Sequence, residues 1–159
     1  MIVFSNTTPF IALSSIRQLH LLPRLFQRIY VVEQVVAECR AGGHIIVHDL
    51  VRFSWIQVVA STPIQHSSRL LELDKGEKHT LDMACKYSAD WVLIDEKVGR
   101  NFAEYLGLKV VGTLGVLLKA KQAGLISSFI RCTAEMQSHG IYYHPLLINK
   151  LATVAGEDA

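Results

Sequence analysis

The sequence is poor in several features that would place it in a specialised class of protein. Its 3 cysteines include no pair at CxxC spacing, which argues against a disulfide framework or a thiolate zinc site. No apolar run reaches the length of a membrane-spanning helix, and the apolar first residues lack the basic segment and cleavage site of a signal peptide. The GxGxxG and GxSxG signatures of dinucleotide-binding and α/β-hydrolase folds are also absent. We therefore expect a cytoplasmic protein with reduced thiols.

Charge is sparse as well. Only 19% of the 159 residues are charged, the net charge is +2, and 50% are hydrophobic. This composition predicts one domain over residues 1–159 with a substantial core, ending in a helix at 144–154 and a frayed tail at 156–159. The mild charge permits a local nucleic-acid-binding patch without indicating one. The high apolar fraction suggests an oligomer interface, which we expect on the apolar helices around residues 9–27.

Apolar runs and turn signals alternate along the chain. The apolar runs predict strands at 1–4, 29–32, 55–59, 91–94 and 109–111. Segments with helical spacing predict helices that start at 9 (with Thr8 as N-cap and Pro9 at N1) and at 23, and that span 33–40, 64–73, 77–87, 97–106, 116–123, 126–138 and 144–154. Residues 45–53 are ambiguous between helix and loop. The alternation predicts an α/β domain with a mainly parallel sheet.

Polar residues follow two of these predicted strands. Asn6 follows the first strand, and Asp95 and Glu96 follow the strand at 91–94. Because parallel sheets place ligand sites outside the carboxyl ends of their strands, we expect these side chains on one rim. Carboxylates gathered there suit hard divalent cations such as Mg²⁺ or Mn²⁺.

Two acidic candidates also have plain structural interpretations. Asp95 is well placed to be the N-cap of the helix predicted at 97–106. Asp74 and Glu77 have the spacing of a capping box, in which Glu77 would bond back to the N-cap amide. Both interpretations stay open at this point.

Three further polar candidates are ambiguous from the sequence. Glu38 falls in the middle of a predicted helix, where a solvated side chain is common, and Asn6 has the character of a turn residue. His44 and His48 have i, i+4 spacing but lack the glutamate of an HExxH motif, so we do not expect a zinc site there.

Short motifs follow one another in a set order along the chain. They are SNTTPFIAL at 5–13, VVAE at 35–38, LDKGE at 73–77, LIDEK at 93–97 with Arg100, and GTLGVLL at 112–118 with Ala120, Lys121 and GLI at 124–126. In this order they resemble the PIN-domain ribonuclease family, specifically its VapC-like DUF3368 branch. The resemblance covers Ile2 to about Tyr143.

The resemblance implies a three-layer α/β/α fold and a site that hydrolyses RNA with Mg²⁺ or Mn²⁺. The catalytic and metal-binding side chains that it implies are Asn6, Glu38, Glu77 and Asp95, with Glu96 as a neighbouring metal ligand. Lys97 and Arg100 lie just after the acidic pair and would contact the RNA backbone, unless they are simply solvated helix charges.

Asn6 departs from the family pattern, because the first position of that pattern is a carboxylate. The favoured function is a cytoplasmic, metal-dependent endoribonuclease of toxin–antitoxin type, dimeric, inhibited by a small antitoxin protein, and weakened by Asn6. The alternative is a PIN-like module that binds RNA or a partner protein without turnover. A third reading, a phosphoacceptor domain, is disfavoured because Asn6 disrupts the usual acidic pair after the first strand.

Overall fold

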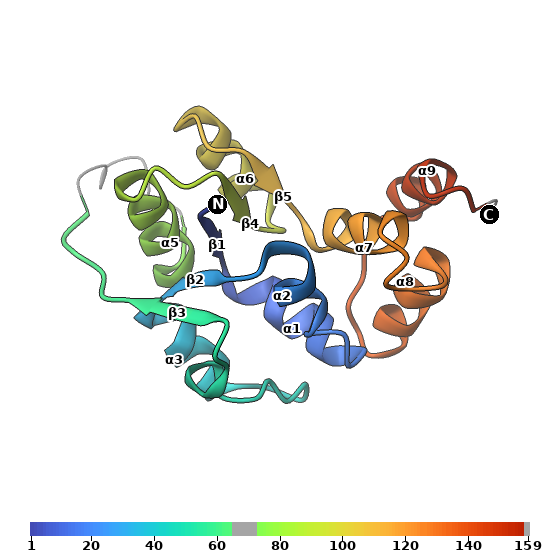
Figure 1. Ribbon diagram of the computed structural model, residues 1–159, viewed down its shortest axis with the longest axis horizontal. Helices are drawn as coiled ribbons and strands as arrows, with labels where there is room; N and C mark the ends of the chain where they lie inside the picture. Colours follow the sequence, from blue (N-terminus) through green and yellow to red (C-terminus); the bar gives the residue numbers. More distant parts are fainter. Residues whose placement is uncertain (65–72, 158–159) are drawn as a thin grey trace.

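A five-stranded parallel sheet forms the centre of the protein (Figure 1). The structure, a computed structural model, describes residues 1–64 and 73–157. The strands are β1 (Val3–Ser5), β2 (Ile29–Val32), β3 (Ile56–Val59), β4 (Trp91–Leu93) and β5 (Val110–Val111). The helices of the described part are α1 (Thr7–Ser15), α2 (Leu21–Phe26), α3 (Glu33–Ala41), η1 (Leu50–Arg52), α5 (Lys75–Lys86), α6 (Lys97–Tyr105), α7 (Thr113–Gln122), α8 (Phe129–Ser138) and α9 (Pro145–Val154).

The strand order β3-β2-β1-β4-β5 creates a switch point between β1 and β4. From β1 the chain builds β2 and β3 to one side, and it then returns to add β4 and β5 on the other side. Register pairs Val3 with Trp91 and Ser5 with Leu93, so β1 and β4 end together. In open α/β sheets the ligand site lies outside the carboxyl ends of the strands at this point.

Helices cover both faces of the sheet, which confirms the expected three-layer α/β/α architecture. On one face α2 packs against β2 and α7, and α7 packs against β5. On the other face α5 packs against β1, β2 and α6. This division follows from right-handed crossovers, because the direction of strand addition reverses after β3. The C-terminal helices α7, α8 and α9 gather at one end of the molecule (Figure 1).

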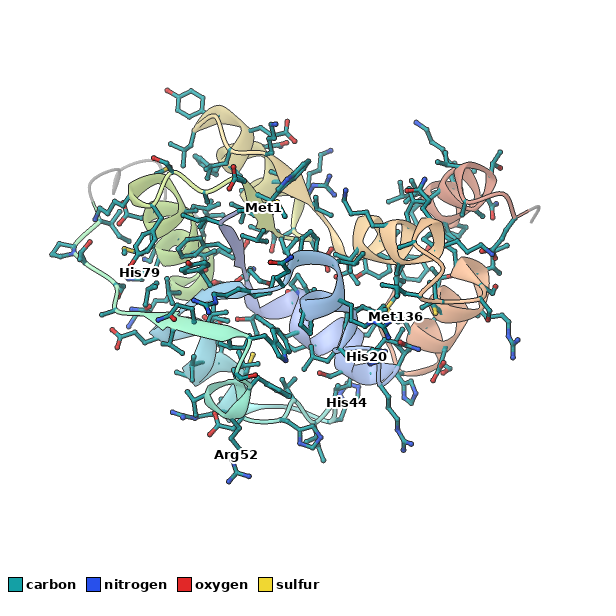
Figure 2. The ribbon with its side chains drawn as sticks, in the orientation of Figure 1. Met1, His20, His44, Arg52, His79 and Met136 are labelled. Carbon is teal, nitrogen blue, oxygen red and sulfur yellow. The ribbon has the colours of Figure 1, made fainter. Side chains whose placement is uncertain are left out.

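The core is continuous from the sheet to these C-terminal helices. Phe4, Leu93 and Phe129 are completely buried within it. In Figure 2, Arg52 projects from the surface, whereas Met136 lies among packed side chains near α8. No helix in the described ranges is long and apolar enough to cross a membrane.

Several apolar residues around 9–27 belong to this core. Phe10, Leu13, Leu21 and Leu22 are fully buried within the chain. Large exposed apolar side chains of the described residues include Val98 and Tyr105 on α6, and Leu146, Leu147 and Val154 on α9. A dimer face around residues 9–27 stays a prediction.

Several element boundaries differ from the prediction for identifiable reasons. The first helix begins at Thr7 with Asn6, not Thr8, in the N-cap position, because Pro9 is tolerated anywhere in a first helical turn. Helix α7 begins at Thr113, not at 116, because Asp95 binds the Thr113 N–H. Residues 45–53 contain only the short η1 helix.

The helix predicted at 64–73 lies almost entirely outside the described residues. The fraying expected at 156–159 does not include Glu157, whose carboxylate accepts hydrogen bonds from Ser128, Phe129 and Ile130.

Candidate active site

The carboxyl ends of β1 and β4 meet directly at the switch point. The backbone N–H of Asn6 donates to the carbonyl of Leu93 at 3.0 Å. Asn6 and Asp95, which follow these two strands, are therefore on one rim of the sheet, as their positions in the sequence predict.

Asn6 is buried at this rim with unused hydrogen-bonding capacity. Asn6 is 3% exposed, and its side-chain Oδ1 has no hydrogen-bond partner in the part of the chain that the structure describes. Although Asn6 is the N-cap residue of α1, its side chain makes no capping bond. A buried amide oxygen without a donor is unfavourable, so a group that pairs with Oδ1 would stabilise the site.

Glu38 connects the segments on either side of the rim. Its Oε2 accepts from the Thr7 hydroxyl at 2.6 Å, and its Oε1 accepts from the Gly76 N–H at 2.9 Å. Thr7 follows Asn6 and Gly76 precedes Glu77, so Glu38 lies between these two candidates. It is half-buried. Glu38 therefore does not occupy the solvated helix position that the sequence left open.

Glu77 is the most perturbed carboxyl of the site. It is 3% exposed, and its Oε2 has no hydrogen-bond partner in the described ranges. Burial, followed by interaction with Asp74 and the negative charge of Glu96, raises the pKa of Glu77 to about 8. Asp74 accepts from the Glu77 N–H at 2.8 Å, so the first half of the expected capping box is present. The carboxyl of Glu77 retains a free oxygen that a cation would stabilise.

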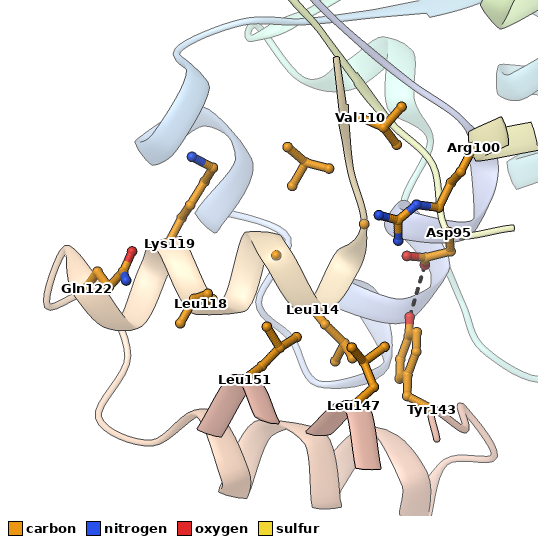
Figure 3. A pocket seen from close by; sticks show the side chains of 13 residues that line it. Asp95, Arg100, Val110, Leu114, Leu118, Lys119, Gln122, Tyr143, Leu147 and Leu151 are labelled. Atoms are coloured by element: carbon orange, nitrogen blue, oxygen red, sulfur yellow. Dashed lines mark hydrogen bonds between the residues drawn. The ribbon is translucent and has the colours of Figure 1, made fainter. Parts of the chain in front are cut away.

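Asp95 is oriented by α7 and by a tyrosine. Its Oδ1 accepts from the Thr113 N–H at 2.6 Å, and its Oδ2 accepts from the Thr113 hydroxyl at 2.6 Å. The Tyr143 hydroxyl also donates to Oδ2, at 3.0 Å (Figure 3). Burial, together with the charge of Asp95, raises the pKa of Tyr143, so its hydroxyl remains a donor. The N-cap of α6 is Glu96, so Asp95 caps α7 instead of the helix that follows it.

The remaining predicted site residues are more open. Glu96 is exposed and makes no side-chain capping bond, and Lys97 is exposed beside it. Arg100 is half-buried, and a Cβ added at Gly112 would lie 3.2 Å from Arg100 Nη1 and 3.0 Å from Asp95 Oδ1. Arg100 therefore shares with Asp95 the side of the rim that faces β5 and α7 (Figure 3).

Two depressions open beside these side chains. A groove of about 480 Å³ is bounded by Thr8, Asp95, Glu96 and Lys97, with residues 140–143 forming its other wall. A second cavity of about 400 Å³ contains Asp95 and Arg100 at one end and runs between α7 and α9 (Figure 3). Asp95 and Glu96 are thus accessible to a ligand.

Residues that the sequence did not single out hold the predicted acids in place. Thr7 and Gly76 bind Glu38, while Thr113 and Tyr143 bind Asp95. Gly99 allows α6 to approach Glu77, because a Cβ there would lie 2.7 Å from Glu77 Oε2. A signal was available for Thr7, Gly76 and Thr113, which lie inside the quoted motifs. No local pattern indicates Tyr143.

The rim fits a hard divalent cation by its donor chemistry. Asn6 Oδ1 and Glu77 Oε2 are buried, unpaired oxygens, and oxygen donors are the ligands that Mg²⁺ and Mn²⁺ prefer. The carboxylates alone do not form a closed cluster. Across residues 1–64 and 73–157, no three His, Cys, Asp or Glu side chains lie close enough together to hold a metal ion.

The fold and rim define the class of protein, a PIN-like α/β/α domain. A model of the DUF3368 family, described as a PIN domain, matches residues 2–157, so the chain belongs to this PIN-domain family. This membership confirms the resemblance to the PIN-domain family that was noted in the sequence. PIN domains are generally nucleases and typically depend on divalent metal ions. Comparison with curated proteins and with solved structures gives no match.

Proposed function

We propose that the protein is a metal-dependent endoribonuclease of toxin–antitoxin type. Its catalytic and metal-binding residues would be Asn6, Glu38, Glu77 and Asp95, with Glu96 as an additional ligand. The observation that carries this proposal is the pair of buried, unpaired oxygens, Asn6 Oδ1 and Glu77 Oε2, at the rim of a PIN domain. Oxygen donors of this kind are the ligands that Mg²⁺ and Mn²⁺ prefer.

Phosphodiester hydrolysis requires an activated water and compensation of the charge that develops on the phosphoryl group. A bound divalent cation would supply both effects. The protein's own contribution is orientation. Glu38 is fixed by Thr7 and Gly76, and Asp95 is fixed by Thr113 and Tyr143. Side chains held in this way lose little freedom when a ligand binds.

The substrate would be RNA, held through its phosphates by the two basic residues at the rim. Lys97 lies in the groove of about 480 Å³, and Arg100 lines the neighbouring cavity beside Asp95. Phosphate contacts of this kind position a nucleic acid without reading its sequence. They would place the backbone over the acids.

A protein partner and self-association belong to the same proposal. Helix α9 carries three large exposed apolar side chains, those of Leu146, Leu147 and Val154. Exposed apolar surface of this kind marks interaction sites. An antitoxin or a second copy of the chain would cover them. A cytoplasmic location is part of the proposed toxin–antitoxin function.

Cleavage of a labelled single-stranded RNA tests the proposal. We expect cleavage with Mg²⁺ or Mn²⁺ that stops when the metal is chelated. Glu77→Ala should reduce the rate by about 100-fold or more, a typical loss for removing electrostatic stabilisation. Glu104→Ala, an exposed acid on α6, is the matched control. Cleavage that survives both chelation and Glu77→Ala would contradict the assignment.

The amide of Asn6 favours one alternative, a PIN-like module that binds RNA or a partner protein without turnover. Asn6→Asp separates the two functions. If wild type cleaves RNA, the enzyme assignment stands, and Asn6→Asp should increase its rate because a carboxylate binds the cation more strongly. If only Asn6→Asp cleaves RNA, the natural chain is the binding module.

A further inference from the structure

Residues 139–143 form an anchored wall beside the candidate active site. At one end the carbonyl of His139 lies 3.1 Å from His44 Nε2. At the other end the Tyr143 hydroxyl donates to Asp95 at 3.0 Å. Between them the N–H of Ile141 donates to the Met136 carbonyl at 3.0 Å. Because it is held at three points, this wall has a defined position relative to the acids.

Tyr142 is the exposed aromatic residue of this wall. Its neighbours Ile141 and Tyr143 are partly buried, whereas Tyr142 is 62% exposed. It nevertheless lines the groove of about 480 Å³, together with Thr8, Asp95 and Lys97. An aromatic ring that is open to solvent adds little to the core, and this ring extends from an anchored stretch of backbone. It is available for a ligand in the groove.

The chemistry of the groove indicates which ligand fits. Thr8 and Lys97 give its other side a hydroxyl and a positive charge that suit a nucleotide. Asp95 and Glu96 on the same side would face the phosphates through the cation of the proposed function. Lys97 would meet a phosphate, while the ring of Tyr142 offers a flat face to a base. Stacking on an aromatic ring is the general way in which proteins hold single-stranded nucleic acids.

We propose that Tyr142 is a stacking platform for a base of the single-stranded RNA substrate, next to the scissile phosphate. This inference rests on the proposed function, because it requires RNA in the groove. It adds a substrate-binding residue that neither the sequence motifs nor the acidic rim indicates. Stacking accepts any base, so Tyr142 would hold the strand without selecting its sequence.

Binding of a short fluorescein-labelled RNA tests this proposal, with Ca²⁺ in place of Mg²⁺ or Mn²⁺ and with intact RNA verified afterwards. Tyr142→Ala should weaken binding by about 5- to 100-fold, the range for loss of one base–aromatic stack. Tyr142→Phe and Tyr142→Trp should bind like wild type, because both keep a flat ring. Tyr105→Ala, which removes a 64% exposed aromatic ring from α6, is the control.

A second RNA series separates stacking from a general effect on structure. The same RNA is made with one abasic nucleotide, moved through each position in turn. At the position that meets Tyr142, the abasic nucleotide should weaken RNA binding by wild type as much as Tyr142→Ala weakens binding of the intact RNA. The same abasic nucleotide should not weaken binding by Tyr142→Ala any further. A structural defect would instead weaken binding of every RNA by the same factor.

The outcomes distinguish this inference from the proposed function. If wild type binds and cleaves RNA but Tyr142→Ala binds as tightly as wild type, the stacking role is wrong and the ribonuclease assignment stands. Weak binding by Tyr142→Phe equal to that of Tyr142→Ala also overturns stacking, because the hydroxyl would then be the contact. If wild type binds no RNA, the proposed function fails together with the inference.

Discussion

Gly76 and Glu38 are in contact across the rim of the sheet, although 38 positions separate them in the chain. The Gly76 N–H donates to Glu38 Oε1 at 2.9 Å, and a Cβ added at Gly76 would lie 2.5 Å from the same oxygen. A side chain at this position would therefore displace the carboxylate of Glu38. The start of α5 reaches the carboxylate only because no side chain intervenes.

Gly76→Ala should displace Glu38 and weaken Mn²⁺ binding. We expect a loss of stability of about 1–3 kcal/mol, typical of overpacking, measured by chemical denaturation. Gly43→Ala is the matched control, because a Cβ there meets nothing within 4 Å. Equal Mn²⁺ affinity in Gly76→Ala and wild type would show that Glu38 does not contribute to the site.

The metal-free protein should become less stable as the pH rises past the pKa of Glu77. The folded-state pKa is raised from 4.5 to about 8. The stabilising contribution of the protonated carboxyl is thus complete below pH 4.5 and is lost as the pH rises through about 8. Glu77→Gln should remove this loss and be more stable than wild type at pH 9 by at least about 1.4 kcal/mol, the equivalent of one pKa unit. If the difference in unfolding free energy between Glu77→Gln and wild type did not change with pH, that result would contradict the buried state of Glu77.

Glu157 should stabilise the C-terminal helices at neutral pH. Burial raises its pKa, but hydrogen bonds from Phe129, Ile130 and Ser128 and the charge of Lys121 outweigh that effect and lower the pKa to about 2. Its contribution is present above the unfolded value of 4.5 and is lost as the pH falls through about 2. Glu157→Ala should cost about 1–2 kcal/mol at pH 7, as for loss of a helix cap.

The comparison for Glu157 is Glu135→Ala on the exposed face of α8. Thermal or chemical unfolding of both variants at pH 7 and at pH 2 gives the required differences. A deficit in Glu157→Ala that is equally large at pH 2 would show that its charge is not the source of the stabilisation.

Thr113→Val should disturb Asp95 without leaving a cavity, because valine has nearly the shape of threonine. The hydroxyl of Thr113 donates to Asp95 Oδ2 at 2.6 Å, and loss of a hydrogen bond to a charged group costs about 1.5–3 kcal/mol. We expect that loss in unfolding free energy together with slower RNA cleavage. Thr153→Val on the exposed side of α9 is the control, and equal effects of the two substitutions would contradict a specific role for Thr113.

Much of the fold was predictable because it depends on local patterns. The run Ile29–Val32 was placed to the residue, and the polar residues after β1 and β4 correctly indicated a shared rim. Family motifs then supplied Glu38 and Glu77, which spacing alone left ambiguous. Such elements carry their signal within a few neighbouring residues.

The partners of the acids were not predictable, since they come from distant parts of the chain. Asp95 was a plausible cap for the helix that follows it, yet it caps α7, which begins 18 residues later. Tyr143 reaches Asp95 across 48 residues. Tertiary contacts of this length are set by how α7 and α9 pack, and no local pattern records them.

Calorimetric titration with Mn²⁺ tests the central claim most directly. Wild type should bind with micromolar to millimolar affinity, and the double variant Glu38→Ala with Asp95→Ala should not bind. The double variant Glu104→Ala with Glu135→Ala removes the same charge from exposed positions and should bind like wild type. Absence of binding in wild type, or binding that survives removal of Glu38 and Asp95, would contradict a metal site at this rim.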